Sequence, residues 1–175
     1  VPPSFPVGSI LINEVAWAGT AASANDEWIE MWNPGQEAIH LDGWRLTDDG
    51  DLQVELTGTI PAGGFLILER TDDRTISNVT AGWIYAGVLA NDGERLRLLD
   101  PSGAEVDVVD ASNGGWPAGD REGRPSMERV GDGWGTYAGG RSRGHDAAGG
   151  PVLGTPGAVN SGVAAMAVFE VSSCT

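Results

Sequence analysis

Residues 25–35, NDEWIEMWNPG, set acidic side chains beside two tryptophans in one short run. The central part, residues 27–33, has the length of a β-strand and is followed by a Pro-Gly turn signal. Because side chains alternate across a strand, Ile29 and Met31 are expected to share one face, and Glu30 lies between the tryptophans on the other. The acidic residues of this run could therefore belong to a binding or catalytic site, or to a strand packed inside a sheet.

The two interpretations of this strand use Glu30 differently. In the first, a carboxylate between aromatic rings binds a sugar or a cation, or serves a hydrolase together with Glu14, its neighbour if residues 9–17 and 27–33 pair. A glycosidase needs two carboxyl groups about 5–10 Å apart across a cleft. In the second, the aliphatic face fills a core and the tryptophans cover a second layer. We favour the second interpretation, because nothing else in the sequence marks a cleft.

Glycine and proline interrupt the whole chain, with 27 and 10 residues among 175. Short apolar runs alternate with turn signals about every ten residues, and no window keeps an apolar helical period over several turns without Gly or Pro. This spacing is typical of an antiparallel β-sandwich or barrel. Seven tryptophans indicate a folded chain. The expected strands are 9–17, 27–33, 38–41, 44–48, 52–56, 65–70, 83–89, 94–100, 104–110 and 126–130.

The charge of the chain restricts its partners. The net charge is −15, and every basic side chain is an arginine because the sequence has no lysine. Such a surface repels the phosphate backbone of nucleic acids and anionic membranes, so nucleic-acid binding is not expected. No apolar run is long enough to span a membrane, and membrane insertion is not expected either. The single cysteine, Cys174, excludes an internal disulfide.

The sequence holds few candidates for metal or nucleophile chemistry. The two histidines, His40 and His145, have no partners at ligand spacing. Acidic turns such as residues 48–51 can hold adventitious calcium, but none follows the EF-hand loop pattern. Residues 140–144, GRSRG, match a nucleophile elbow but lack the strand before it and the helix after it. We therefore predict no catalytic residue, no metal site and no cofactor.

Two tryptophans are the candidates for ligand binding. Trp116 and Trp134 lie in glycine-rich segments that are expected to form loops, and binding residues are often carried by loops. Together they suggest a carbohydrate-binding or calcium-dependent surface-binding site.

The order of short motifs along the chain carries a further signal. The chain contains, in this order, LINEVAW, DEWIEMWNPG, LDGWRLTD, IPAGGFLILER, NDGERLRLLDPSGAEVDVVD, WPAG, SMER and GTPGAVN. This order resembles that of the lamin tail domain family in its prokaryotic form, and the resemblance covers Ser9 to Asn160. It implies an immunoglobulin-like antiparallel β-sandwich, in agreement with the strand pattern.

The resemblance also implies roles for particular residues. Leu41 and Trp44 would anchor a strand in the core, on either side of an Asp-Gly bend. Residues 91–94 would open a hairpin, and residues 154–157 with Asn160 would close the domain by a fixed turn.

We expect three segments in the chain: a Pro-rich linker at residues 1–8, the sandwich domain at 9–161, and a last strand or the start of a further domain at 162–175. An exposed strand in the last segment would allow a homodimer through edge pairing.

Prokaryotic members of the family usually occur as modules of larger secreted or surface proteins, and the family is not known for catalysis. The resemblance therefore implies a non-catalytic interaction or targeting module, extracellular or on the cell surface, whose partner is a protein or a cell-surface polymer. The alternatives are a carbohydrate- or calcium-dependent surface-binding module, a hydrolase built on Glu14 and Glu30, and a hydrolase-associated nucleic-acid-binding domain.

Overall fold

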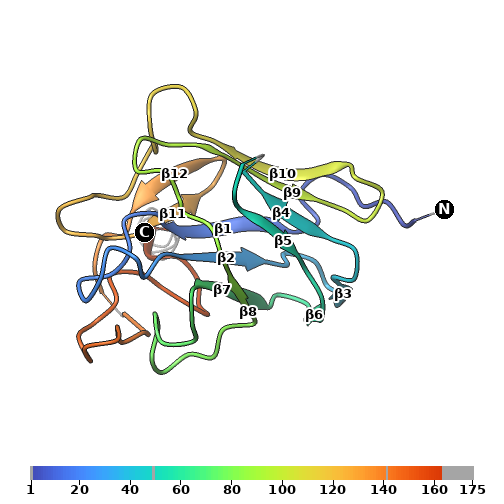
Figure 1. The fold of residues 1–175 in the computed structure, drawn as a ribbon. Helices are drawn as coiled ribbons and strands as arrows, with labels where there is room; N and C mark the ends of the chain where they lie inside the picture. Colours follow the sequence, from blue (N-terminus) through green and yellow to red (C-terminus); the bar gives the residue numbers. More distant parts are fainter. Residues whose placement is uncertain (1, 49, 141, 163–175) are drawn as a thin grey trace, which may run out of the picture.

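The fold consists of β-strands joined by turns and loops (Figure 1). The computed structural model describes residues 2–48, 50–140 and 142–162. The strands of this part are β1 (Leu11–Ala16), β2 (Trp28–Trp32), β3 (Ile39–His40), β4 (Arg45–Thr47), β5 (Gln53–Glu55), β6 (Thr59–Ile60), β7 (Phe65–Arg70), β8 (Trp83–Tyr85), β9 (Arg95–Leu99), β10 (Glu105–Asp110), β11 (Met127–Val130) and β12 (Gly133–Thr136).

Two sheets pack face to face and enclose the main core (Figure 1). A six-stranded sheet has the order β12-β11-β1-β2-β7-β8, and a four-stranded sheet has the order β10-β9-β4-β5, while β3 and β6 form a separate ribbon. Buried side chains from both sheets meet in one cluster, among them Ile29 and Met31 of β2 and Leu46 of β4. The predicted β-sandwich is therefore confirmed.

The second strand is covered on both faces. Ile29 and Met31 point into the main core, whereas Trp28 belongs to a second apolar cluster on the outer side, with Ile67 and Ile76 among its members. All five side chains are at most 5% exposed. The architectural interpretation of the opening run is confirmed for these residues. Ile29 and Met31 fill the main core on one face of β2, and Trp28 is buried in the outer cluster on the other.

Each of the ten predicted strands contains an observed strand, and the structure adds two strands that the sequence did not predict, β6 and β12. The ribbon strand β6 consists of two β-branched residues, too short a run to mark a strand, and β12 reads GWGT, in which two of the four residues are glycine. β8 pairs with β7 in parallel, whereas the other strand pairs of the described residues are antiparallel. Residues 71–82 provide the long crossover that a parallel pair requires.

The expected anchor residues of the fold lie where the family resemblance placed them. Leu41 and Trp44 are fully buried, and Trp44 N donates to Leu41 O at 2.9 Å across the Asp-Gly bend. Gly43 has a φ of 84° in this bend, a conformation that favours glycine. The hairpin β9–β10 forms as predicted.

The Pro-rich N-terminal segment contacts the sandwich through the residues that the structure describes. Phe5 N donates to Asp100 Oδ2 at 2.8 Å, and the Phe5 ring lies 4.8 Å from that of Trp44. Gly8 N donates to Val106 O at 2.8 Å. The segment predicted as a linker thus makes specific contacts with the four-stranded sheet. The predicted C-terminal strand at 162–175 lies outside the described residues, apart from Gly162.

Candidate functional site

Three glutamates lie side by side on the outer face of the six-stranded sheet. β1 pairs with both β2 and β11, and the registers set Glu14 opposite Glu30 on one side and opposite Glu128 on the other. None of the three is more than 1% exposed. We call these residues the acid row. Because neighbouring strands are only about 4.8 Å apart, the three carboxyl groups influence one another.

A β-bulge in β1 helps to build the acid row. The register between β1 and β2 slips between Ile12 and Glu14, so the side-chain alternation is interrupted there. Ile12 stays in the main core, while Asn13 reaches the outer side, where its Nδ2 donates to Glu30 Oε1 at 2.7 Å. Asn13 and Glu14 therefore both contribute to the outer face, although they are adjacent in the sequence.

Residues 153–161, which we call the closing segment, cover the acid row. Ser126 N, just before β11, donates to Leu153 O at 2.8 Å and fixes the beginning of the segment. Each carboxyl group of the acid row then accepts a hydrogen bond from a backbone N–H of this segment. The bonds run from Thr155 N to Glu14 Oε1 (2.9 Å), from Gly157 N to Glu30 Oε2 (2.6 Å), and from Ser161 N to Glu128 Oε1 (3.0 Å) and Oε2 (3.1 Å).

Asn160 holds the other end of the closing segment. Its Nδ2 donates to Arg129 O at 2.8 Å and to Asn13 O at 3.1 Å. Its Oδ1 accepts from Asn13 Nδ2 at 2.9 Å. The turn predicted at residues 154–157 and the role predicted for Asn160 are thus present, and together they tie the closing segment to β1 and β11.

Burial changes the protonation of the acid row. Desolvation raises the pKa of Glu14 to about 8; the Glu128 carboxylate adds to this shift, and hydrogen bonds from Ser126 and Thr155 oppose it. Desolvation also raises the pKa of Glu30 well above 4.5, and the proximity of Glu14 adds to that effect. Glu14 and Glu30 therefore favour their neutral forms at pH values where an exposed glutamate is ionised.

Three further glutamates show the same behaviour at other places in the fold. Burial raises the pKa of Glu27, of Glu69 and of Glu94 to about 7 each, against the effect of hydrogen bonds from backbone N–H groups. The donors are Leu89 N to Glu27 (2.9 Å), Thr75 N and Ile76 N to Glu69 (3.0 and 3.2 Å), and Ala90 N to Glu94 (2.9 Å). Each of these acids holds a loop against a strand end or turn.

The structure brings together the two carboxyl groups of the hydrolase interpretation but encloses them. Glu14 and Glu30 are neighbours in the register, and both are fully buried. Their oxygen atoms accept hydrogen bonds from side chains and backbone groups of the chain itself. Neither carboxyl group is exposed to solvent in this structure. Ser142, the serine of the GRSRG motif, has the carbonyls of Gly144 and Val152 as acceptors for its one hydroxyl hydrogen.

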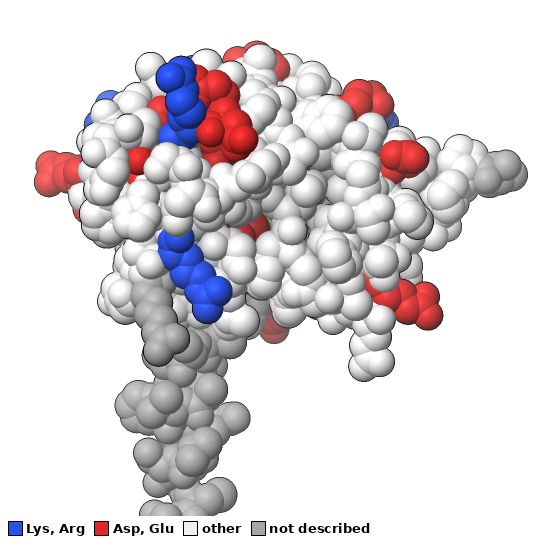
Figure 2. Space-filling view, turned by 90° about the horizontal axis from the view of Figure 1, so that it is seen from below, with Lys and Arg blue, Asp and Glu red and all other residues white. Residues whose placement is uncertain are grey.

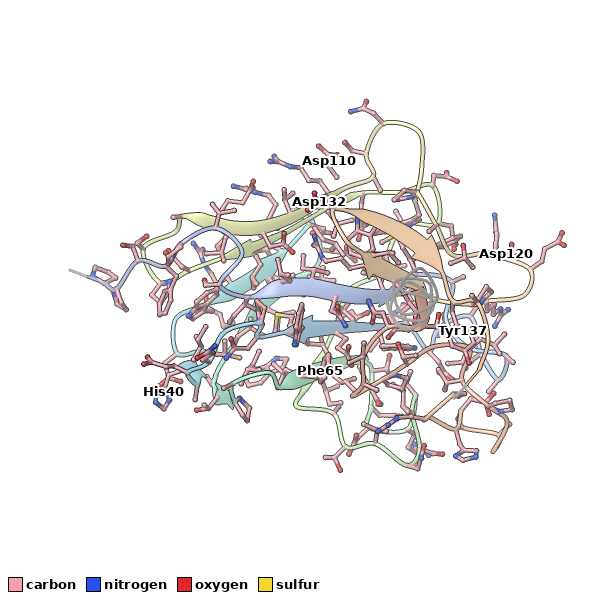
Figure 3. The ribbon with its side chains drawn as sticks, turned by 180° about the vertical axis from the view of Figure 1, so that it is seen from behind. His40, Phe65, Asp110, Asp120, Asp132 and Tyr137 are labelled. Atoms are coloured by element: carbon pink, nitrogen blue, oxygen red, sulfur yellow. The ribbon has the colours of Figure 1, made fainter. Side chains whose placement is uncertain are left out.

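Trp116 lines an open hollow at one end of the sandwich. The hollow has a volume of about 520 Å³ and lies between Trp116, Trp17 and the loop that carries Asp120 and Arg121. The rings of Trp17 and Trp116 are stacked, with centroids 6.2 Å apart and planes 9° apart. Asp120 lies on a loop that projects at the opposite end of the molecule from His40 (Figure 3). No local sequence signal identified Trp17, because it joins Trp116 from 99 positions earlier in the chain.

The hollow is fixed by hydrogen bonds from both indole nitrogens. Trp116 Nε1 donates to Ala90 O at 2.7 Å, and Trp17 Nε1 donates to Ala118 O at 2.9 Å. Gly119 N donates to Thr136 Oγ1 at 2.9 Å. The two rings are therefore held in place before any ligand arrives.

Trp134, the second predicted ligand residue, lies elsewhere. It is in β12 opposite Arg129, and the Arg129 guanidinium lies 4.7 Å from the centre of the indole ring. Arg129 Nη2 also donates to Asp107 Oδ2 at 2.6 Å. Trp134 thus covers an ion pair between the two sheets, and the structure does not bring it into the Trp116 hollow.

A smaller apolar hollow of about 180 Å³ lies beside the acid row. Trp32 and Phe65 stack there with centroids 6.4 Å apart, and Val159 of the closing segment is 64% exposed on its rim. Phe65 lies at the start of β7 on the outer side of the sheet (Figure 3).

Within the part of the chain that the structure describes, no three or more His, Cys, Asp or Glu residues are grouped to hold a metal ion. In the acidic turn that could hold adventitious calcium, Asp48 Oδ1 accepts from Gly50 N at 2.5 Å and from Leu52 N at 3.1 Å. No helix within residues 2–48, 50–140 and 142–162 has the length and apolar character that a membrane span needs.

The charged side chains are dispersed on the surface. On the face shown in Figure 2, one group of acidic atoms adjoins an arginine at the upper left, other acidic residues stand apart, and the arginines do not form one continuous patch. Several arginines pair with carboxylates, as in the bond between Arg97 Nε and Glu105 Oε2 at 2.8 Å. The face shown in Figure 2 lacks the basic stripe of a typical nucleic-acid-binding surface.

The two packed sheets and their closing turn define an immunoglobulin-like β-sandwich. The lamin tail domain family matches residues 3–113, which is more than half of the chain, and the chain belongs to this family. β11, β12 and the closing segment lie after the matched residues but complete the same six-stranded sheet and its cover. No curated protein has significant sequence similarity to the chain.

The raised pKa values predict that stability decreases as pH rises. A folded chain that keeps protons on Glu14, Glu69 and Glu94 up to pH 7–8, while the unfolded chain releases them near 4.5, loses stability between these pH values. Glu27 is not counted among them, because Arg70 Nη1 donates to its Oε1 at 3.0 Å and this ion pair favours the carboxylate. Each proton that the folded chain holds and the unfolded chain releases makes the free energy of unfolding fall by at most about 1.4 kcal/mol per pH unit as the pH rises. Denaturant titrations from about pH 5 to 8.5 should show this decrease.

The same titrations in high salt are the control. Salt screens repulsion between surface carboxylates, whereas the buried groups are little affected, so most of the decrease should persist. A free energy of unfolding that stays constant or rises over the interval would contradict the prediction.

The close approach of the closing segment predicts that Gly154→Ala is destabilising. A Cβ at Gly154 would lie 2.5 Å from Glu14 Oε1 and 2.8 Å from Trp28 Cζ2, so we expect a loss of roughly 1–3 kcal/mol in the free energy of unfolding. The matched control is Gly133→Ala, whose Cβ would meet nothing closer than 3.8 Å; it should change stability by less than about 0.5 kcal/mol. Equal effects in the two variants would contradict the prediction.

Proposed function

We propose that this chain is a non-catalytic interaction or targeting module of a larger secreted or cell-surface protein. Its partner would be another protein or a cell-surface polymer, and its place extracellular or at the cell surface. Membership in the lamin tail domain family supports a module built for contact. The net charge of −15 disfavours nucleic acid as the partner.

The observation that carries this proposal is the use of the buried carboxyl groups. Acid–base catalysis needs a carboxyl group that reaches the substrate, and carboxyl groups with raised pKa values are the first candidates for it. In this chain, Glu14 and Glu30 are covered by the closing segment and bond its backbone. Glu27, Glu69 and Glu94 are occupied by loop N–H groups in the same way. The acids that would be suited to chemistry serve the architecture.

Assays of hydrolysis test the absence of catalysis. The purified chain should not turn over nucleic acids, phosphate esters or glycans at a rate that depends on Glu14 or Glu30. Glu30→Gln and Glu14→Gln should match the unmodified chain in each assay. An activity that either substitution abolishes in a folded variant would overturn the proposal.

A carbohydrate-binding module is the second candidate, and the Trp116 hollow favours it. The half-buried ring of Trp116, stacked on the buried ring of Trp17, offers a rigid apolar surface, and an indole ring held in this way carries large contact area at low entropic cost. Asp92, Asp120 and Arg121 border the same hollow with polar groups. A flat apolar surface bordered by hydrogen-bonding side chains suits a sugar ring. The ligand would be a neutral saccharide, because the chain repels polyanions.

Binding to soluble cell-wall glycans tests this candidate by calorimetry. Trp116→Ala should weaken binding by tenfold or more, since burying a tryptophan at a binding site often contributes about 2 kcal/mol or more. Arg121→Ala, an exposed change at the rim, should weaken binding without affecting the fold. Trp134→Ala is the matched control and should leave affinity unchanged.

Titrations with calcium and with a chelator separate a calcium-dependent mode from a direct one. Binding that Trp116→Ala and Arg121→Ala leave unchanged would exclude the hollow as the site. A complete lack of glycan binding would exclude the carbohydrate candidate and leave the interaction module.

A further inference from the structure

Thr155 Oγ1 lies at a point where the acid row and the closing segment meet. It is 2.7 Å from Glu128 Oε1, 3.0 Å from Glu14 Oε2 and 3.4 Å from Asn160 Oδ1. All three neighbouring atoms are oxygens that accept hydrogen bonds when the glutamates are ionised. A hydroxyl group has one hydrogen to donate. The cluster therefore needs a further proton at this point.

The amide of Asn160 does not supply it. Asn160 Nδ2 faces two backbone carbonyls, those of Asn13 and Arg129, so the orientation of the amide is fixed and Oδ1 faces Thr155. The missing hydrogen consequently belongs to one of the two carboxyl groups, Glu14 or Glu128.

The partners of each oxygen atom show which carboxyl group carries the proton. Both oxygens of Glu128 accept hydrogen bonds from Ser161, and Oε1 accepts from Thr155 Oγ1 as well. Both oxygens of Glu128 are therefore already occupied by donors and leave no free position for a proton directed at Thr155. In Glu14, Oε1 accepts from Ser126 Oγ at 2.5 Å and from Thr155 N at 2.9 Å, whereas Oε2 has Thr155 Oγ1 as its partner. Glu14 Oε2 is the atom with room for a proton.

We propose that Glu14 is a neutral carboxylic acid at neutral pH, that it donates its proton to Thr155 Oγ1, and that its ionisation loosens the closing segment from the sheet. The proton then runs in one direction, from Glu14 Oε2 to Thr155 Oγ1 and from Thr155 Oγ1 to Glu128 Oε1. Loss of the Glu14 proton leaves a carboxylate on either side of the Thr155 hydroxyl group, which can donate its one hydrogen to only one of them. The other carboxylate then repels the hydroxyl oxygen, and the two carboxylates repel each other.

The other groups near Glu14 favour the same state. Glu30 of β2 and Glu128 of β11 flank it in the sheet. The pKa of Tyr137, after β12, is raised by burial and by its nearness to Glu128 and Glu14, and Tyr137 lies on this outer side of the sheet (Figure 3). The Arg129 side chain bonds Ile12 O and Asp107 instead of the acid row.

The sign of the pH effect follows from the pKa values. Glu14 has a pKa of about 8 under the closing segment and about 4.5 when exposed. The equilibrium constant for opening of the segment therefore rises up to about tenfold per pH unit between these values and levels off above the higher one. Below a pH of about 4.5, Glu14 is protonated in both the closed and the open state, and its full contribution to closure is present.

Hydrogen exchange of the full chain, measured by mass spectrometry as protection factors, tests the proposal. Peptides covering residues 153–161 should lose protection by up to about tenfold per pH unit from pH 5 to 8, more steeply than peptides from the β9–β10 hairpin. Glu14→Gln keeps a donor at the position of Oε2 and an acceptor at Oε1, so it should keep the segment protected and remove this pH dependence. Glu128→Gln places an amide where three donor groups converge, Thr155 Oγ1, Ser161 N and Ser161 Oγ, and should reduce protection at every pH.

A direct titration of the unmodified chain makes the test independent of the variants. The carbon-13 shift of the Glu14 carboxyl group, assigned with the Glu14→Gln variant or by selective labelling, should report the neutral acid at pH 6. Three results would each overturn the proposal. These are a Glu14 carboxyl group that is ionised at pH 6, loss of closure in Glu14→Gln with retention in Glu128→Gln, or protection of residues 153–161 that is independent of pH.

Discussion

Hydrogen bonds from backbone N–H groups to carboxylate side chains hold the loops of this sandwich in place. A fold of short strands leaves many backbone donors outside the sheets, and buried donors must find partners. The sequence supplies 25 acidic residues and no lysine, so there are more carboxylates than cations to pair with them. Asp100 is an example: it accepts from the backbone of Phe5, Ser102 and Ala104. One acid thereby fixes the N-terminal segment and the turn after β9 together.

This use of acids leads to opposite protonation behaviour in different places. Burial alone would raise the pKa of Asp100, but its hydrogen bonds outweigh burial and lower it. In the acid row, burial outweighs the hydrogen bonds, and the pKa of Glu14 rises. A carboxyl group with a raised pKa is often taken as a sign of catalysis. Here the raised pKa of Glu14 has a structural origin. The closing segment buries the carboxyl group that accepts its backbone hydrogen bond, and this burial removes the carboxyl group from water.

The sequence was sufficient for the strands and faces but insufficient for the site. Alternation in residues 27–33 identified the buried face of β2, because the period of a strand is a local property. The bulge that places the neighbouring residues Asn13 and Glu14 on the same face of the sheet was not predictable from the sequence, since it depends on pairing with β2. Trp17 was missed for the same reason, because its partner Trp116 comes from a distant loop. β12 was missed because two of its four residues are glycine, which carries no strand signal. The order of the motifs predicted the family correctly. Trp134 was predicted to lie in a loop because of the glycines around it, but it lies in strand β12.

The closing segment also has a consequence for the order in which the chain folds. Asn13 and Asn160 are 147 residues apart, and Glu14 and Thr155 are 141 apart. Contacts of such separation form late and slow the folding of β-rich domains. During synthesis from the N-terminus, β1 and β2 leave the ribosome long before the residues that will cover them. Their glutamates remain hydrated until residue 161 has emerged, so the nascent sheet carries a charged, water-bound face that protects it from premature association with other chains.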